Sequence, residues 1–168
     1  AGPDLSCWRH ARNGAEPIRA AAEADFLATF APHGLPHDCL SHSYGMSEAT
    51  AELTAEPLDH RGVFLRLAAD ALARGRVREA TPDEPARIVA GCGVPTGDTT
   101  LLIVDPDTHH TCPEDHVGEV WIRGASVARG YWHNDDATAA TFRARLADAP
   151  DGPDHLRSGD LGFVRDGQ

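Results

Sequence analysis

The chain has 168 residues, enough for one domain of ordinary size or for two small subdomains. Hydrophobic residues make up 41% of it and charged residues 24%, so the composition favours a folded core over disorder. The formal net charge is −11, which argues against nucleic acid as a partner because an acidic protein repels the phosphate backbone. No apolar run approaches the length that spans a membrane, so no membrane partner is expected. All 15 basic residues are arginines, so the chain offers no catalytic lysine.

Cysteine spacing gives no sign of a metal or redox motif. The four cysteines form no C-x-x-C pair, which argues against a zinc ribbon or a thioredoxin-like site: Cys7, Cys39, Cys92 and Cys112. His109, His110 and Cys112 are close in sequence but lie in a turn-like segment, so solvated turn residues are favoured over a metal site. No signal peptide precedes the cysteines, and reduced thiols in a cytoplasmic protein are expected.

The two ends of the sequence indicate a piece of a larger protein. Residues 1–4 do not begin with Met and read as a loop that enters mid-fold. Residues 160–168 read as a strand that reaches a turn with no return strand. The alternative is a small complete domain with a processed N-terminus.

The first part of the chain has the pattern of a β-α-β unit. A short strand is expected within residues 5–13, followed by the tight turn Asn13-Gly14-Ala15-Glu16-Pro17. Apolar residues at intervals near three and four predict an amphipathic helix over residues 18–30, with Pro17 in its first turn. A strand over residues 38–43 then leads into Tyr44. Because ligands of open parallel sheets bind at the carboxyl ends of strands, both polar loops would lie on one rim.

The middle of the chain changes from helical to β character. Residues 49–55 fit either a strand or a short helix. Residues 63–73 are rich in helix formers and are predicted to form a helix that ends at Gly75. Residues 76–87 carry charges and two prolines, and are predicted to form a surface loop. Since β signals dominate afterwards, we expect a subdomain boundary near residue 88.

The second part, residues 89–168, is predicted to be β-rich. Residues 101–106 and 117–124 read as two strands joined by a turn-rich loop, and therefore as an antiparallel pair. Residues 135–146 are predicted to form a helix capped by Asp135 or Asp136.

The densest group of chemistry-bearing side chains is Tyr44-Gly45-Met46-Ser47-Glu48. A Tyr ring can stack on a base, and a glycine lets backbone approach a ligand closely. A Ser hydroxyl can donate to a phosphate oxygen, and a Glu can hold Mg²⁺, which usually bridges to phosphates. These residue types suit a nucleotide site. From these residues alone, a polar loop after a strand with Tyr44 half buried is an equal alternative.

Four blocks in a fixed order resemble the adenylate-forming superfamily of acyl-CoA synthetases, luciferases and nonribosomal-peptide adenylation domains. They are Asn13-Gly14-Ala15-Glu16-Pro17, Tyr44-Gly45-Met46-Ser47-Glu48, residues 118–124 running on to Gly130-Tyr131-Trp132, and Arg157-Ser158-Gly159-Asp160-Leu161. Each block alone is weak, but four in order with compatible spacing cover essentially the whole chain. Within the superfamily, the sequence is most similar to fatty-acyl-AMP ligases. Three features indicate this: Trp8-Arg9 before the first block, Glu-Ala-Thr shortly after the Tyr-Gly pair, and the segment 71–77 before Cys92-Gly93. Those ligases carry an extra segment in this region, and residues 56–87 are a candidate for it.

The resemblance implies a role for individual residues. Tyr44 would stack on adenine, Ser47 would meet the α-phosphate, Glu48 would ligate Mg²⁺, and Asp160 would accept hydrogen bonds from the ribose hydroxyls. Ser47 and Glu48 would be the catalytic residues. The implied nucleotide-binding positions are Asn13, Gly14, Ala15, Glu16, Pro17, Tyr44, Gly45, Met46 and Asp160.

The resemblance also implies a fold and a reaction. The fold class would be α/β plus β: the end of an α/β sheet subdomain over residues 1–88, then a small β-barrel-like subdomain over residues 89–168. The enzyme would use ATP and Mg²⁺ to activate a fatty acid or another carboxylic acid as acyl-AMP. It would then pass the acyl group to an acyl or peptidyl carrier protein, as in polyketide and nonribosomal-peptide secondary metabolism.

Some expected features of the superfamily are absent, and several alternatives stay open. The phosphate loop with its Lys and the C-terminal domain with its catalytic Lys lie outside this block order. Ser47 and Ser158 stand where Thr is commoner, and residues 51–54 are more polar than the expected strand. The alternatives are an acyl-CoA ligase, an amino-acid adenylation domain, a non-catalytic scaffold of the same fold, and a binding module with a Cys/His metal.

Overall fold

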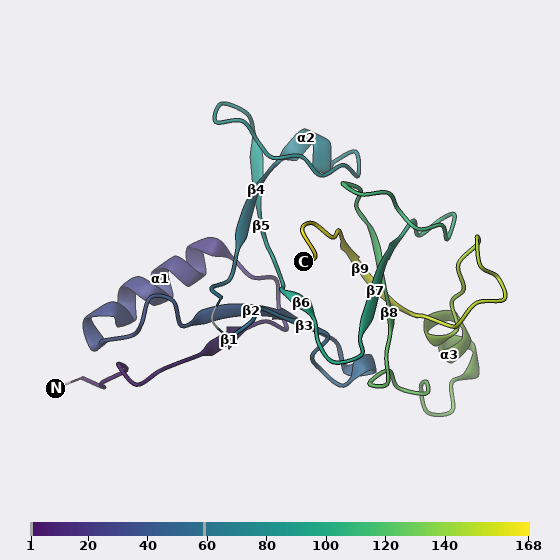
Figure 1. Cartoon of the computed structure of the whole chain (residues 1–168), viewed down its shortest axis with the longest axis horizontal. Helices are drawn as coiled ribbons and strands as arrows, with labels where there is room; N and C mark the ends of the chain where they lie inside the picture. The colour runs from purple at the N-terminus through teal and green to yellow at the C-terminus, as the bar shows by residue number, and fades with distance from the viewer. Residues whose placement is uncertain (1, 59) are drawn as a thin grey trace.

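In the computed structural model, which describes residues 2–58 and 60–168, the strands form sheets of four, two and three strands (Figure 1). The strands are β1 (Ala11–Asn13), β2 (Leu40–Tyr44), β3 (Thr54–Ala55), β4 (Phe64–Ala68), β5 (Ala86–Ala90), β6 (Val94–Pro95), β7 (Thr100–Val104), β8 (Gly118–Arg123) and β9 (Leu156–Gly162). The helices are α1 (Ala20–Phe30), α2 (Ala69–Leu72) and α3 (Asp135–Phe142), with 3₁₀ turns at Ala31–His33 and Ser47–Ala49.

The predicted β-α-β unit is confirmed. Strand β1 pairs in parallel with β2, with Asn13 opposite His42, and α1 connects them. The first strand is shorter than expected, and the helix begins at Ala20, so Pro17 lies before it. The helix gives way to a 3₁₀ turn that ends at Gly34, whose φ of +80° suits a residue without a Cβ.

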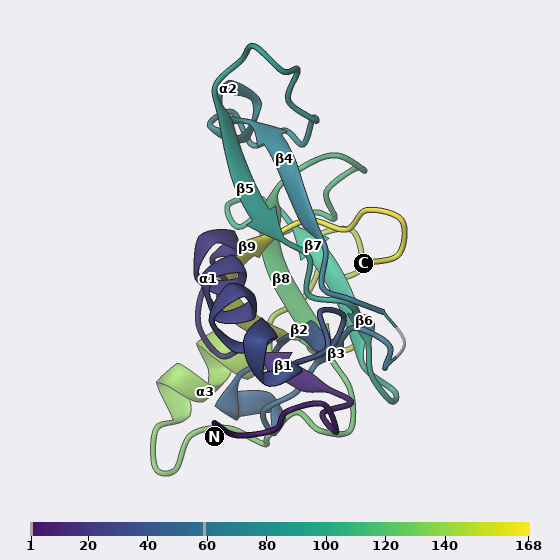
Figure 2. The same cartoon turned by 90° about the vertical axis from the view of Figure 1, so that its left-hand side faces the viewer.

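Only part of the predicted apolar face of α1 packs against the rest of the chain. Leu27 and Phe30 contact a small core around Leu40, whereas Phe26 is 36% exposed. Figure 2 shows α1 nearly end-on beside β1 and β2. The buried position of the helix is Glu23, because its carboxylate contacts His42 Nε2 at 2.8 Å. Periodicity could not predict this contact, which joins two polar residues of different elements.

The predicted helix over residues 63–73 is largely wrong. Residues Phe64–Ala68 form β4, which pairs with β5 in antiparallel register, and only Ala69–Leu72 is helical. Long-range pairing has overridden the local helix propensity of Leu and Ala, as it commonly does. The predicted end of the helical segment at Gly75 is confirmed. The Gly75 N–H donates to the Leu72 carbonyl at 3.0 Å, and Gly75 has a φ of +69°.

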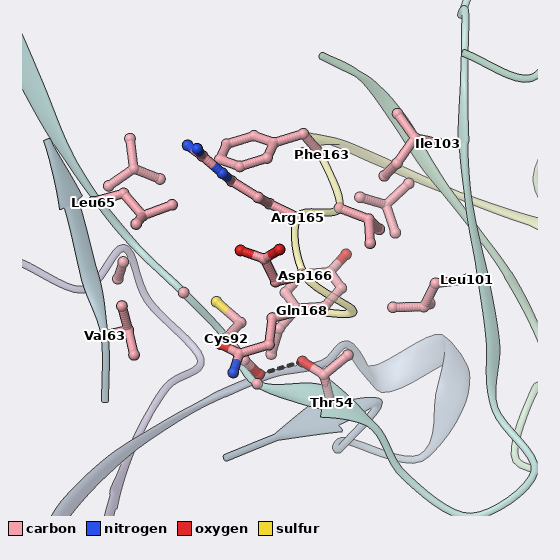
Figure 3. Close-up of a pocket in the computed structure, with 18 of the residues that line it drawn as sticks. Thr54, Val63, Leu65, Cys92, Leu101, Ile103, Phe163, Arg165, Asp166 and Gln168 are labelled. Carbon is pink, nitrogen blue, oxygen red and sulfur yellow. Dashed lines mark hydrogen bonds between the residues drawn. The ribbon is translucent and has the colours of Figure 1, made fainter. Parts of the chain in front are cut away.

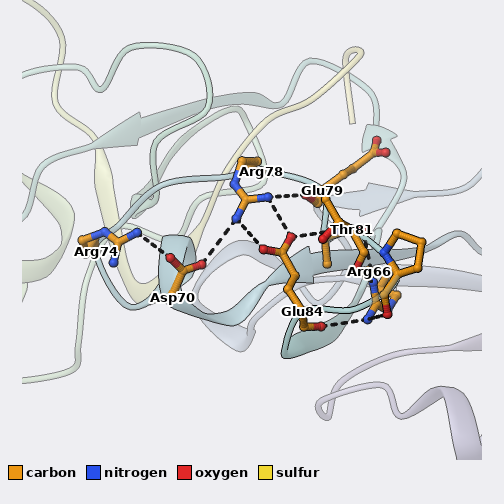
Figure 4. Close-up of polar contacts among 9 residues, drawn as sticks. Arg66, Asp70, Arg74, Arg78, Glu79, Thr81 and Glu84 are labelled. Carbon is orange, nitrogen blue, oxygen red and sulfur yellow. Dashed lines mark hydrogen bonds and ion pairs between the residues drawn. The ribbon is translucent and has the colours of Figure 1, made fainter.

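A network of arginines holds the loop between α2 and β5 (Figure 4), which was predicted over residues 76–87 but gives way to β5 at Ala86. Arg66 donates to the carbonyls of Thr81 and Glu84, and Arg78 forms a bidentate pair with Glu84. Arg78 and the Thr81 N–H lower the pKa of Glu84 to about 2. Because Arg66 and Arg78 are exposed and Glu84 is partly exposed, the network fixes the shape of the loop more than it stabilises the fold.

The third sheet contains the predicted antiparallel pair. β7 pairs with β8, and β8 pairs with β9, giving an open sheet in the order β7-β8-β9. The expected barrel-like closure is not confirmed in the described part of the chain, where β7 and β9 are the two edges of this sheet. Helix α3 ends at Phe142 rather than at residue 146, and its cap is Asn134, whose side chain accepts the Ala137 N–H.

The loop after β2 packs directly on the third sheet. The open question over residues 49–55 resolves as a 3₁₀ turn over Ser47–Ala49 followed by the short strand β3. Ala49 and Leu53 are fully buried, and their cluster includes Ile122 and Leu156. This core brings the end of β2 against β8 and β9.

Candidate functional site

A hydrogen bond joins the two residues that were predicted to hold the nucleoside. Tyr44, the last residue of β2, donates from its hydroxyl to Asp160 Oδ2 in β9 at 2.7 Å, across 116 positions of sequence. Burial raises the pKa of the Tyr44 phenol well above its ordinary value, and the bond to Asp160 raises it further. Tyr44 is therefore a permanent donor that fixes one oxygen of the Asp160 carboxylate.

The chain turns back sharply after Tyr44. A Cβ at Gly45 would overlap the carbonyl oxygen of Ala51, so only glycine fits at this crossing. The Met46 carbonyl accepts both the Ala49 and the Ala51 N–H at 3.1 Å. Thr50 bonds from its hydroxyl to the Ser126 carbonyl at 2.8 Å, which attaches the turn to the loop after β8.

The turn presents Glu48 to a tyrosine from a distant segment. The Tyr131 hydroxyl donates to Glu48 Oε1 at 2.8 Å, and the Ala128 N–H donates to the Glu48 carbonyl at 2.8 Å. The bond to Glu48 raises the pKa of the Tyr131 phenol. The Tyr131 ring packs edge-on against Phe142, with centroids 5.1 Å apart.

Tyr131 was recognised as part of a sequence block but received no role. The 83 positions between it and Glu48 leave no local pattern that would pair them. The only sequence signal was that both residues lie in blocks of the same ordered set.

The first block lies on the neighbouring strand. Asn13 is the last residue of β1, and a Cβ at Gly14 would lie 2.7 Å from the Ser43 carbonyl oxygen, so the chains approach closely just before Tyr44. Ala15 has a φ of +66°, which marks the tight turn that the sequence predicted. Glu16 and Pro17 are exposed, as is Ser47 at the start of the 3₁₀ turn.

A small cavity of about 380 Å³ opens beside Glu48. Seven of the residues that line it come from the turn after β2, from β8 and β9 and from the Tyr131 loop: Met46, Glu48, Glu119, Tyr131, Arg157, Ser158 and Gly159. It therefore joins the second, third and fourth sequence blocks in one place. Asn13, Gly14, Ala15, Glu16 and Pro17 do not line it.

A larger cavity of about 590 Å³ lies between the β4–β5 pair and the third sheet (Figure 3). Val63 and Leu65 line it from one side, and Leu101 and Ile103 from the other. Tyr44 and Asp160 are also among its lining residues, and the segment 163–168 runs through it. The Tyr44–Asp160 pair thus lies at an apolar cavity, while Glu48 lies at a polar one.

The donor set around Glu48 suits a hard cation bound mainly by a ligand. Within residues 2–58 and 60–168, no group of three or more His, Cys, Asp or Glu side chains could hold a metal ion. Mg²⁺ needs no such cage, since it is commonly bound by one or two carboxylates together with substrate phosphates and waters. One carboxylate at the edge of a cavity fits that pattern.

The four cysteines are free thiols, and burial raises the pKa of Cys39, Cys92 and Cys112. No helix in the described part of the chain is both long and apolar enough to cross a membrane.

Comparisons with known proteins agree on one family. The profile described as "AMP-binding enzyme" matches residues 1–132. The chain is 42% identical over 168 residues to the medium-chain-fatty-acid–[acyl-carrier-protein] ligase JamA of Moorena producens, covering 98% of this chain and 28% of that protein.

Solved structures of this kind are also similar. A fatty acyl-adenylate ligase from L. pneumophila in complex with acyl adenylate and pyrophosphate has a TM-score of 0.90 and 34% identity, over 98% of this chain and 28% of that one. The adenylation domain of a keto acid-selecting NRPS module bound to keto acyl adenylate has a TM-score of 0.81 and 29% identity, over 98% of this chain and 30% of that one. The chain thus spans less than a third of the length of these relatives.

Proposed function

This chain belongs to the family of AMP-binding enzymes, and from that premise we propose that it forms the adenosine-binding part of an ATP-dependent fatty-acyl-AMP ligase. The observation that carries the proposal is the convergence of Tyr44, Glu48 and Asp160. The Tyr44 hydroxyl bonds to Asp160 in β9, and Glu48 lies in the turn just after Tyr44, where Tyr131 holds it. Glu48 lines a neighbouring cavity together with Ser158 and Gly159, the two residues before Asp160.

In the proposed reaction, a carboxylate oxygen of the acid attacks the α-phosphorus of ATP, pyrophosphate leaves, and acyl-AMP forms. The acyl carbon is then attacked by the phosphopantetheine thiol of a carrier protein, and AMP leaves. Little covalent chemistry is needed from the protein, so its contribution is positioning and charge stabilisation.

The described residues would divide this work. Asp160, held by Tyr44, would accept hydrogen bonds from the ribose hydroxyls, and the Tyr44 ring would face the adenine. The backbone of Asn13, Gly14, Ala15, Glu16 and Pro17, with Gly45 and Met46, would line the adenine pocket. Ser47 would donate to the α-phosphate. Because Ser47 is exposed, its hydroxyl is free to reach a bound ligand.

Glu48 would hold the magnesium ion. When bound, Mg²⁺ would neutralise charge on the phosphates of ATP. Tyr131 fixes Glu48 Oε1 by its hydrogen bond, so the carboxylate is oriented before any ligand arrives.

The subclass and partners follow from the relatives. One named relative is a ligase for a fatty acid and an acyl-carrier protein, and a similar structure contains an acyl adenylate. We therefore propose a fatty acid as substrate and a carrier protein of polyketide or nonribosomal-peptide secondary metabolism as acceptor. We further propose that the enzyme is cytoplasmic, that residues 1–88 and 89–168 belong to different subdomains, and that β7–β9 contribute to a barrel-like one.

The experiment uses the full-length polypeptide that contains residues 1–168. It is incubated with ATP, Mg²⁺, a panel of fatty acids, CoA and a holo carrier protein, and the products are followed by mass spectrometry. Acyl-AMP and acylated carrier without acyl-CoA is the expected result. Acyl-CoA as the main product would overturn the subclass. No adenylate with any fatty acid would favour an amino-acid substrate or a non-catalytic scaffold.

The 168-residue chain alone should not form acyl-AMP. It spans 28% of the length of its relatives and contains no lysine to meet the phosphates. Turnover by the purified chain, above that of a Glu48→Ala variant, would contradict this.

A further inference from the structure

Glu119 is a buried carboxylate whose donors come from its own strand, β8, and from the residues of β9 just before Asp160. It lies in β8 and is 4% exposed. Its Oε2 accepts Arg157 Nη2 at 2.7 Å, Arg157 Nε at 3.0 Å and Trp121 Nε1 at 3.0 Å. Its Oε1 accepts the Gly159 N–H at 3.1 Å. Both oxygens are thus fully engaged by donors on β8 and β9.

These bonds replace an interrupted part of the strand ladder. Glu119 pairs with Leu161 and Trp121 pairs with Arg157, so the single residue between Glu119 and Trp121 on β8 faces three residues on β9. The residues between, Ser158, Gly159 and Asp160, bulge out of the ladder, and Gly159 has a φ of +75°. Bulges of this kind re-aim side chains at functional sites. Here the bulge directs Asp160 to the Tyr44 hydroxyl.

We propose that Glu119 is a positioning residue for nucleotide recognition: by holding Arg157 and the Gly159 N–H, it fixes the bulge that aims Asp160 at the ribose. The inference rests on the proposed function, because it assumes that Asp160 meets the ribose hydroxyls. Glu119 also lines the cavity beside Glu48, but both of its oxygens are engaged by these donors, so its proposed role is indirect. Its effect passes through the backbone of a segment that starts at its ion-pair partner and ends at the ribose-binding carboxylate.

The charge of Glu119 is essential to this arrangement. Burial alone would raise the pKa of its carboxyl, but the bonds from Arg157, Trp121 and Gly159 outweigh burial and lower it. A neutral glutamine would have the same shape, but its NH₂ group would face an N–H donor whichever way the amide is turned. One bond to Arg157, Trp121 or Gly159 must then be lost, and the bulge loosens.

The test measures how well the full-length polypeptide distinguishes ATP from 2′,3′-dideoxy-ATP. Binding is followed by calorimetry in the absence of any acid substrate, so the readout does not depend on turnover. The wild type should prefer ATP, and Asp160→Ala should abolish the preference. Glu119→Gln should reduce it roughly tenfold, which corresponds to the loss of one charged hydrogen bond.

Glu23→Gln is the matched control. Glu23 is also 4% exposed and also bonded through its carboxylate, but its partner is His42 of β2 and not a residue of the β9 bulge. This variant should lower the melting temperature and leave the preference for ATP unchanged. If Glu119→Gln yields no folded protein, Arg157→Lys serves instead. Lysine keeps the charge but lacks the planar guanidinium that donates to Glu119 from both Nε and Nη2, so the preference for ATP should also fall.

The outcomes separate this inference from the function on which it rests. A wild type with no preference for ATP would overturn the proposed ribose site and this inference together. A preference that Asp160→Ala removes but that survives both Glu119→Gln and Arg157→Lys would overturn the inference alone. An equal loss of preference in Glu23→Gln would also overturn it, because any buried carboxylate would then have the same effect.

Discussion

Replacing Tyr44 with phenylalanine tests the bond that joins β2 to β9. The change removes only the hydroxyl, so the ring keeps its contacts with the core around Leu53 and Ile122. A hydrogen bond to a charged acceptor contributes about 1.5–3 kcal/mol to stability. Asp160 is exposed, and solvent screening reduces the expected loss in the free energy of unfolding to about 1 kcal/mol. For a chain of this size that is a fall in melting temperature of about 2–4 °C.

The assay is urea denaturation of the wild type, Tyr44→Phe, Asp160→Ala and the double variant. The midpoint should fall in each single variant while the slope is unchanged. The double variant should lose less than the sum of the two, because both changes remove the same bond. Tyr131→Phe is a control with another phenol-to-carboxylate bond, on a side chain that is 40% exposed, and it should cost less.

The pH dependence gives a further check on Tyr44. Its pKa in the folded chain is raised above the unfolded value of about 10. The stability that the bond contributes is therefore complete below pH 10 and is lost as the pH rises through the raised pKa. Tyr44→Phe should show a smaller alkaline loss, because only Tyr131 then has a raised pKa. Two results would refute the reasoning. One is a stability loss in the double variant that equals the sum of the two single losses, and the other is an alkaline loss in Tyr44→Phe as large as that of the wild type.

Three other predictions concern local features of the chain. The 168-residue chain has two tyrosines, and both have a raised pKa, so phenolate absorbance should appear only above the ordinary range near pH 10. Titration of both phenols at the ordinary pKa would contradict the contacts of Tyr44 with Asp160 and of Tyr131 with Glu48. Gly45→Ala should cost more than about 3 kcal/mol by denaturation because its Cβ overlaps the Ala51 carbonyl, whereas Gly75→Ala, with open space around it, should cost about 1 kcal/mol for its positive φ. An NMR titration should give Glu84 a pKa of about 2, and Arg78→Ala should raise it towards its ordinary value; an unchanged pKa would show that Arg78 is not the cause.

Much of the fold was predictable where short-range patterns decide it. The spacing of apolar residues located α1. An apolar run stopped by Asp-Pro located β7 and alternation located β8, and the turn-rich loop between them predicted their antiparallel pairing. The same reasoning failed for Phe64–Ala68, because its residues suit a helix and only pairing with β5, some twenty positions later, makes them a strand. Closure of a barrel is likewise a long-range property, which the sequence blocks alone did not determine.

The candidate site was predicted one residue at a time, but its connections were not. Tyr44, Glu48 and Asp160 were identified from residue chemistry and from the ordered blocks. The bond from Tyr131 to Glu48 and the bonds from Arg157 and Gly159 to Glu119 emerged only from the fold, because hydrogen bonds between segments distant in sequence leave no periodic signal. The buried contact between Glu23 and His42 was missed for the same reason, since a polar residue on a helix is ordinarily expected to face solvent.

The central claim is that Tyr44, Glu48 and Asp160 form one nucleotide site. The most direct measurement is a crystal structure of the full-length polypeptide that contains residues 1–168, with AMP and Mg²⁺ bound. In that structure the ribose hydroxyls should donate to Asp160, the adenine should lie against the Tyr44 ring, and the metal should contact Glu48. AMP bound with its ribose away from Asp160, or no AMP bound at any concentration, would contradict it.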